Sequence, residues 1–387
     1  MATTPPILRM PLELLQQTFE VVFSKHSQHG LRCEDMLSLR LVCREISAAV
    51  FDQFVATYLR QRTCCAADND QLDKLVLYLD TQPLAREIRT VTLTLRTESS
   101  YHVEPDVDRL NGVAQRLAEQ NCELRLDFGT QIPWRDFPKD SYWTCTVLKA
   151  LVGNDCRIRS LSASERSLPD MLPDRCWTHK HLAALAELRT LRFDFDLYND
   201  CFRYPNKQRS MAELVATTTD LEELNLIMCT NPGGYRNPGQ YGFAGTVFLA
   251  INSRCLSKMP LRSVHVEPEA LIQCLKRFQG TLRRLRFRQV SLITIPGDTL
   301  QPSAEAWTEV LGVMADIPLE DLLVEDCYLT SGYSTRRICV RPHPRWVEYV
   351  GEHRGGELAL NEQSPRKIRE QLSATLKRGL MLNERPW

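Results

Sequence analysis

Apolar residues recur along most of the chain in one short pattern, Leu-x-x-Leu-x-Leu or a variant with other apolar side chains. The alternation within it predicts a short strand with one apolar face. Eight copies between residues 88 and 319 give a mean step of 33 residues. They lie at Ile88/Val91/Leu93, Leu124/Leu126/Phe128, Ile158/Leu161, Leu188/Leu191/Phe193, Leu221/Leu224/Leu226, Leu261/Val264/Val266, Leu282/Leu285/Phe287 and Leu319/Leu322/Val324.

Helical patterns separate these strands. Ser210 and Glu213 form a capping box, and Ser303 precedes an apolar stripe that includes Trp307. Strands and helices that alternate every 20–40 residues are typical of a solenoid, whose repeats bury their apolar faces on one another. The predicted helices span residues 70–80, 106–120, 210–218, 269–279 and 303–315.

The predicted fold is therefore α/β, with an array that resembles irregular leucine-rich repeats and has parallel strands. The steps vary from 21 to 40 residues, and the Asn or Cys that usually follows such a strand is inconsistent. A flatter α/β arrangement therefore stays open.

Residues between the apolar positions are expected to face outward and to line one sheet. One predicted row consists of Arg284, Arg286 and Arg288, and the neighbouring rows contain acidic residues. Guanidinium groups suit a carboxylate or phosphate on a partner. Alternatively, they pair with the acidic rows beside them, which is the interpretation we favour. The candidate partner-binding residues on the sheet are Arg192, His265, Arg284, Arg286 and Arg288.

Two insertions, at residues 128–143 and 231–245, interrupt the repeats. Such insertions project as loops, often on the binding side of a solenoid. Aromatic side chains on the second one, Tyr235, Tyr241 and Phe243, are candidate anchors for a partner. The alternative is that Tyr241 and Phe243 pack back onto the sheet edge.

Residues 10–54 have a separate helical pattern. Pro11 suits a first helical turn. Leu14, Leu15 and Phe19 then lie on one face of the predicted helix. Two more short helices follow. So small a unit buries little apolar surface by itself, so it requires a partner or a larger domain.

Two blocks within this unit, Met-Pro-Leu-Glu-Leu-Leu at 10–15 and Leu-Arg-Leu-Val-Cys-Arg at 39–44, resemble the F-box. This helical module binds the small adaptor subunit of Skp-cullin-F-box ubiquitin ligases. Met10, Thr18 and Ile46 depart from the residues usual in that family, and Thr18 places a hydroxyl on the contact face. The resemblance implies adaptor contacts by Pro11, Leu12, Leu14, Leu15, Leu37, Leu39, Val42, Cys43 and Ile46.

The predicted domains are a tail at 1–9, the F-box-like module at 10–56, the repeat array at 57–333 and a C-terminal segment at 334–387. That last segment is basic and irregular up to Pro365. The helix expected after Pro365, with Ile368, Leu372 and Leu376 on one face, is expected to cap the array.

The 48 Lys and Arg residues balance the 48 Asp and Glu residues, which argues against nucleic-acid and membrane partners. Fourteen scattered cysteines, without a secretory signal or a membrane-length apolar run, predict reduced thiols in the cytoplasm or nucleus. The pair Cys64 and Cys65 and the cluster Cys176, His179 and His181 lack a second ligand pair. We therefore expect no metal and no cofactor.

No phosphate-binding loop, nucleophile elbow, zinc-protease or dinucleotide motif is present in the sequence, so we expect no catalytic activity. The sequence favours a ubiquitin-ligase subunit that binds the adaptor through residues 10–54 and a protein substrate through the repeats. The alternative is a leucine-rich-repeat-like scaffold that joins no ligase and buries its F-box-like face internally.

Overall fold

The protein is described from a computed structural model. The described residues are 14, 60–81, 84–95, 106–128, 140–164, 183–196, 205–229, 243–294, 305–331, 334–340, 358–360, 364–378 and 380–384. The chain divides into two compact units, Met1–Arg125 and Leu126–Trp387, and the division falls within one strand. Each unit is described by itself. In the described ranges, no helix is both long enough and apolar enough to cross a bilayer.

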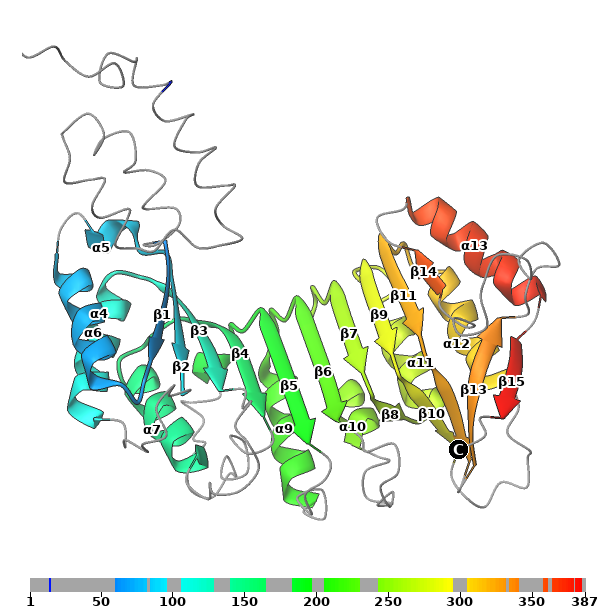
Figure 1. The fold of residues 1–387 in the computed structure, drawn as a ribbon, viewed down its shortest axis with the longest axis horizontal. Helices are drawn as coiled ribbons and strands as arrows, with labels where there is room; N and C mark the ends of the chain where they lie inside the picture. Colours follow the sequence, from blue (N-terminus) through cyan, green and yellow to red (C-terminus); the bar gives the residue numbers. More distant parts are fainter. Residues whose placement is uncertain are drawn as a thin grey trace, which may run out of the picture. The chain divides into compact units, whose positions relative to one another are not determined.

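The first unit places helices beside parallel strands (Figure 1). Strands β1 and β2 pair in parallel. Asp68 caps α4 by accepting a bond from the Gln71 backbone N–H, and Asp106 caps α6 in the same way. Ion pairs of 2.6 Å, Arg109–Asp73 and Arg116–Asp80, join the two helices. The elements are β1 (Gln61–Cys65), α4 (Asn69–Asp80), α5 (Leu84–Glu87), β2 (Thr90–Thr94), α6 (Val107–Glu119) and β3 (Glu123–Phe128), the strand that contains the division.

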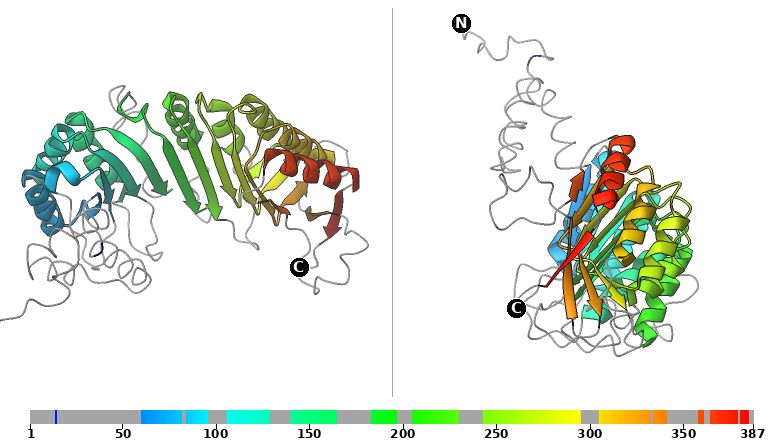
Figure 2. Two further views of the ribbon diagram at one scale, coloured as in Figure 1. Left: turned by 90° about the horizontal axis from the view of Figure 1, so that it is seen from above. Right: turned by 90° about the vertical axis from the view of Figure 1, so that its right-hand side faces the viewer.

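The main sheet of the second unit has the strand order β4-β5-β6-β7-β9-β11-β14. All neighbours pair in parallel except β11 and β14, which are antiparallel. Helices α9 to α12 lie on one face of this sheet (Figures 1 and 2). Its elements are α7 (Asp140–Gly153), β4 (Ile158–Ser164), β5 (Thr190–Asp196), α9 (Pro205–Thr217), β6 (Glu223–Cys229), α10 (Phe243–Ala250), β7 (Lys258–Arg262), α11 (Pro268–Arg277), β9 (Arg284–Arg288), α12 (Glu305–Ala315), β11 (Asp321–Glu325) and β14 (Leu358–Leu360).

The same backbone contact joins each of these repeats to the next. The carbonyl of Arg189 accepts bonds from two successive N–H groups, those of Glu222 and Glu223. The carbonyls of Glu222, Ser257 and Arg283 each accept an equivalent pair from the following repeat. Because one acceptor fixes the start of the next strand, the apolar residues of successive strands line up in one core layer.

A second sheet has the order β15-β13-β12-β10-β8. It arises because the chain turns after β7, β9 and β11 at Ser263, Gln289 and Asp326, which all have positive φ. The Ser263 hydroxyl bonds to the Gln289 side chain at 2.9 Å, so consecutive turns stack. The strands are β8 (His265–Val266), β10 (Ser291–Thr294), β12 (Tyr328–Ser331), β13 (Ser334–Val340) and β15 (Leu380–Glu384).

Helix α13 (Pro365–Arg378) packs beside α12. Ile368 and Leu372 are buried, and Arg369 pairs with Asp316 at 3.1 Å. The segment before this helix is not irregular as expected, since it contains β13 and β14. Helix α9 begins at Pro205, upstream of the Ser210 capping box at which the sequence predicted its start.

The α/β class and the parallel strands were predicted correctly. One strand was misplaced. The predicted strand through Leu261, Val264 and Val266 runs across the turn at Ser263, whereas the structure places β7 at Lys258–Arg262. The motif that forms β7 is Leu256-x-x-Met259-x-Leu261, and all three of its apolar residues are buried.

Candidate binding surface

Basic side chains gather on the outward positions of β7 and β9. We call Lys258, Arg262, Arg284, Arg286 and Arg288 the basic strand face. Alternate residues on the same two strands, Met259, Leu261, Leu285 and Phe287, are buried, so the pleat directs the basic residues away from the core.

Strand register places like charges beside each other on this face. Lys258 lies opposite Arg284, and Arg262 lies opposite Arg288. Like charges directly opposite one another are unfavourable in a sheet. An anion that bound between them would remove that repulsion.

Acidic neighbours neutralise only part of the basic strand face. Arg286 contacts the Asp321 Oδ2 through its Nε at 2.8 Å and its NH2 at 2.7 Å. Arg288 pairs with Glu325 at 2.6 Å, and Lys258 lies 3.6 Å from Glu223. Within the described ranges, Arg262 and Arg284 have no ion pair and are exposed.

Among the described residues, Arg284 has no ion pair because the carboxylate opposite it pairs with another arginine. Asp321 lies opposite Arg284 in the register, but its carboxylate turns to Arg286. Its Oδ1 is buried and finds no hydrogen-bond partner in the part of the chain that the structure describes. The Asp321 charge therefore stabilises Arg286, and among the described residues the guanidinium of Arg284 has no carboxylate partner.

Two strands away, Arg192 and Asp194 occupy neighbouring outward positions of β5. Arg192 NH2 lies 3.6 Å from the Asp194 carboxylate. Burial raises the pKa of Asp194 above its ordinary value, and the positive charges of Arg192 and Arg262 partly oppose that shift. Strand β6 separates this pair from the basic strand face, and Asn225 lies opposite Arg192.

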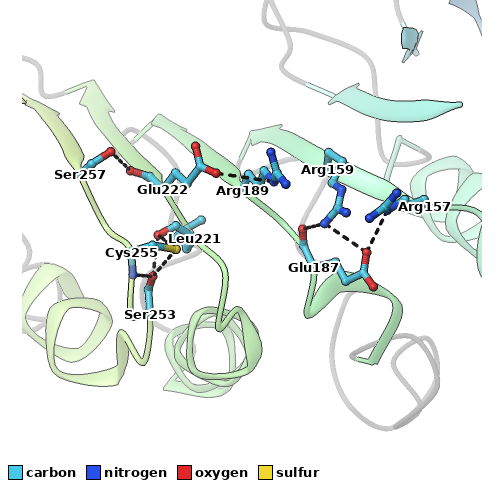
Figure 3. A network of polar contacts seen from close by, with 9 residues as sticks. All are labelled: Arg157, Arg159, Glu187, Arg189, Leu221, Glu222, Ser253, Cys255 and Ser257. Atoms are coloured by element: carbon cyan, nitrogen blue, oxygen red, sulfur yellow. Dashed lines mark hydrogen bonds and ion pairs between the residues drawn. The ribbon is translucent and has the colours of Figure 1, made fainter. Parts of the chain in front are cut away.

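A chain of polar contacts follows the beginnings of β4 to β7 (Figure 3). Arg157 and Arg159 both pair with Glu187, at 3.2 and 3.1 Å, and Arg189 pairs with Glu222 at 3.6 Å. On the next repeat, the Ser253 hydroxyl donates to the Leu221 carbonyl at 2.6 Å. Because these charges are paired between adjacent repeats, we assign this edge a structural role.

The structure separates the predicted sheet residues into different environments. Arg286 and Arg288 pair with the acidic row, as in the interpretation that we favoured. His265 was wrongly placed in the same sheet as these arginines. It belongs to β8 and lies opposite Ser291 of the second sheet, because the turn at Ser263 ends β7 first.

Of the predicted aromatic anchors, the structure describes only Phe243. Phe243 begins α10 and is buried, so the prediction of an exposed anchor is wrong there. Tyr235 and Tyr241 lie outside the described residues. The sequence reasoning missed Lys258 and Arg262, which a search starting from Leu256 would have found on β7.

The adaptor-binding residues also lie outside the described residues, with one exception. Leu14 is helical and 46% exposed. The other predicted contacts stay predictions.

Several buried thiols have raised pKa values. Burial is the main reason why the pKa values of Cys64, Cys274 and Cys327 rise to about 12, so these thiols stay protonated near neutral pH. The eight cysteines whose side chains the structure describes are free. The described segments contain no group of residues arranged to hold a metal ion, while Cys176, His179 and His181 fall outside them.

No protein-family model and no curated protein matches the chain. Among solved structures, it matches a protein of Labrenzia alexandrii that is named provisionally as a mandelate racemase/muconate lactonizing enzyme. The TM-score is 0.21 and the identity 10%, over 70% of this chain and 73% of that chain. Because that protein is named as an enzyme, our expectation that this chain is not one is corrected, and we no longer exclude catalysis. So low a TM-score assigns neither fold nor activity to this chain.

Proposed function

We propose that the protein is the substrate-recognition subunit of a Skp-cullin-F-box ubiquitin ligase. In this proposal residues 10–54 bind the adaptor subunit and, through it, a cullin. The outward face of the strands binds a protein substrate. The observation that carries the proposal is the ordered pair of F-box-like blocks, which precedes the repeats in the sequence. Helices α9 to α12 cover one face of the sheet and leave the polar strand face uncovered (Figure 2).

We further propose that the repeats form a leucine-rich-repeat-like solenoid. The repeated double acceptance by one carbonyl supports this, because each repeat then contacts chiefly its neighbours. The recurring turn at Ser263, Gln289 and Asp326 is a second support. Its three copies follow the apolar pair of β7, β9 and β11 at the same position.

The exposure of Leu14 supports the adaptor-binding part of the proposal. A scaffold that used its F-box-like face internally would bury this leucine against residues 60–95. Leu14 keeps 46% of its surface accessible, and exposed apolar surface is a feature of partner-binding faces.

The mechanism is one of positioning. Holding a substrate beside the ubiquitin carrier raises its effective concentration there, to the millimolar range for short flexible links. We propose the cytoplasm or the nucleus as the location, where the free thiols of the described segments would stay reduced.

Co-expression with the adaptor subunit, followed by size-exclusion chromatography, tests this proposal. We expect co-elution of the wild type and its loss in the Leu14→Asp/Leu15→Asp variant. Leu77→Asp/Leu249→Asp is the matched control, because Leu77 and Leu249 are also exposed leucines, on α4 and α10. It should co-elute like the wild type.

Circular dichroism must show that each variant is folded. A folded, monodisperse wild type that does not co-elute would contradict the proposal and leave the scaffold function. Equal loss of co-elution in the control would show that the effect is not specific to the F-box-like face.

A further inference from the structure

We infer that the basic strand face binds an extended acidic segment of a protein partner, with carboxylates at alternate positions. This inference rests on the proposed function in one respect, since it names the substrate class that the strand face would recognise. The site consists of Lys258, Arg262, Arg284, Arg286 and Arg288.

The charge balance of the surface calls for an anion. Five cations lie on two adjacent strands, and only Lys258, Arg286 and Arg288 have a carboxylate within 4 Å in the described part of the chain. Arg262 and Arg284 are the two that have no ion pair in the described ranges for a ligand to break, although the charge of Arg262 also acts on Asp194 of β5. Guanidinium groups bind carboxylates through two parallel hydrogen bonds, so both are well suited to side chains of Asp or Glu.

The spacing of the cations indicates an extended ligand. The outward positions form three rows, Lys258 with Arg284, Pro260 with Arg286, and Arg262 with Arg288. Successive rows lie about 7 Å apart, because each row advances two residues along a strand. An extended peptide that runs along the strands repeats its side chains at the same interval, so carboxylates at i, i+2 and i+4 would face all three rows.

Acidic residues border the basic strand face on both sides, which limits the size of the ligand. Glu223 lies beside Lys258 on β6, and Asp321 and Glu325 lie on β11. The basic region is therefore only two strands wide, or about 5 Å between strand axes. A nucleic acid would place further phosphates over these carboxylates, whereas a short acidic peptide segment fits between them.

Fluorescence anisotropy of labelled peptides tests the inference on the full-length protein. The probe is a peptide of alternating Glu and Thr. Its controls are a peptide of the same composition with contiguous glutamates and a peptide with Gln in place of Glu. We expect the alternating peptide to bind at least about tenfold more tightly than either control, since two charge-assisted contacts are at stake.

Variants of the protein locate the binding. Arg262→Gln/Arg284→Gln removes the two arginines of this face that pair with none of the described carboxylates at ion-pair distance, and we expect at least about tenfold weaker binding. The matched control, Lys276→Gln/Lys367→Gln, removes the same charge from exposed positions on α11 and α13. It should change affinity less than about twofold, because it alters only long-range attraction.

Several results would overturn the inference. They are equal binding by the arginine variant and wild type, equal weakening in the lysine control, equal affinity for the contiguous peptide, or stronger binding of single-stranded DNA of the same charge. The outcome is separable from that of the ligase proposal. Arg262→Gln/Arg284→Gln should still co-elute with the adaptor, and Leu14→Asp/Leu15→Asp should still bind the peptide.

Discussion

Substitution of Trp307 by Phe tests how the two sheets of the second unit are joined. Trp307 lies on α12 and is fully buried. Its indole Nε1–H donates to the Tyr328 carbonyl of β12 at 2.8 Å. Its ring meets Phe287 of β9 edge to face, with centroids 6.5 Å apart at 64°. One side chain thus connects a helix, the main sheet and the second sheet.

The expected loss of stability follows from these contacts. Removing the indole N–H leaves the Tyr328 carbonyl without that donor, which costs about 1 kcal/mol. The smaller ring buries less apolar surface, which costs about 1 kcal/mol more. We therefore expect Trp307→Phe to lower the free energy of unfolding by about 2 kcal/mol, and Trp307→Ala by about 4 kcal/mol.

Urea unfolding followed by far-UV circular dichroism measures this loss. The six tryptophans of the chain would average any fluorescence signal. Leu249→Ala, at an exposed position of α10, is the control and should cost less than about 0.5 kcal/mol. A double-mutant cycle with Phe287→Leu should return a coupling of about 1 kcal/mol. A loss below about 0.5 kcal/mol in Trp307→Phe would refute the reasoning.

Two further predictions concern buried charge and thiol ionisation. Arg286→Met should cost about 2 kcal/mol, because it leaves the Asp321 carboxylate, whose side chain is only 10% exposed, without its partner. Urea unfolding should show that Arg286→Met/Asp321→Leu recovers most of this loss, and no recovery would contradict the explanation. Stability should also fall as pH rises above about 9. The thiols of Cys274 and Cys327 hold their protons up to a pKa of about 12 when folded but lose them near 9.0 when unfolded. By about pH 10, each thiol should lower the free energy of unfolding by about 1.4 kcal/mol. Urea unfolding of Cys274→Ala, below about pH 9 and at about pH 10, should show a pH-dependent loss that is smaller than that of the wild type by one such contribution.

Sequence periodicity predicted the elements whose partners lie nearby. The helix expected at 106–120 matches α6, since Asp106 caps it and the apolar spacing of Leu110 and Leu117 requires no distant information. The strand around Leu285 and Phe287 was located for the same reason.

Elements that depend on tertiary contacts were missed. The turn at Ser263 has no Gly or Pro, so the apolar pattern continued across it and β7 was placed too late. Strand β13 pairs with β15, which follows about 40 residues later, and no local periodicity could reveal that pairing.

The candidate surface was predicted in part for the same reasons. Arg284, Arg286 and Arg288 stand out in the sequence because they alternate on one strand. Arg262 was missed because β7 was placed too late, and the register then places it opposite Arg288. That Asp321 would pair with Arg286 rather than with the facing Arg284 follows from side-chain geometry, which the sequence does not contain.

The change of strand direction at β14 has a consequence for how this array can vary in length. In the main sheet β14 runs antiparallel to β11, and in the second sheet β13 and β15 run antiparallel to the strands before them. A repeat added after β11 and β12 would place a parallel strand beside each of them, where the antiparallel strands β14 and β13 already pair. A three-residue strand such as β14 also offers a short edge to other chains. At this end of the array, a repeat gained by duplication or by design must therefore enter ahead of β13 and β14, which keep their places as the last strands paired with the repeats.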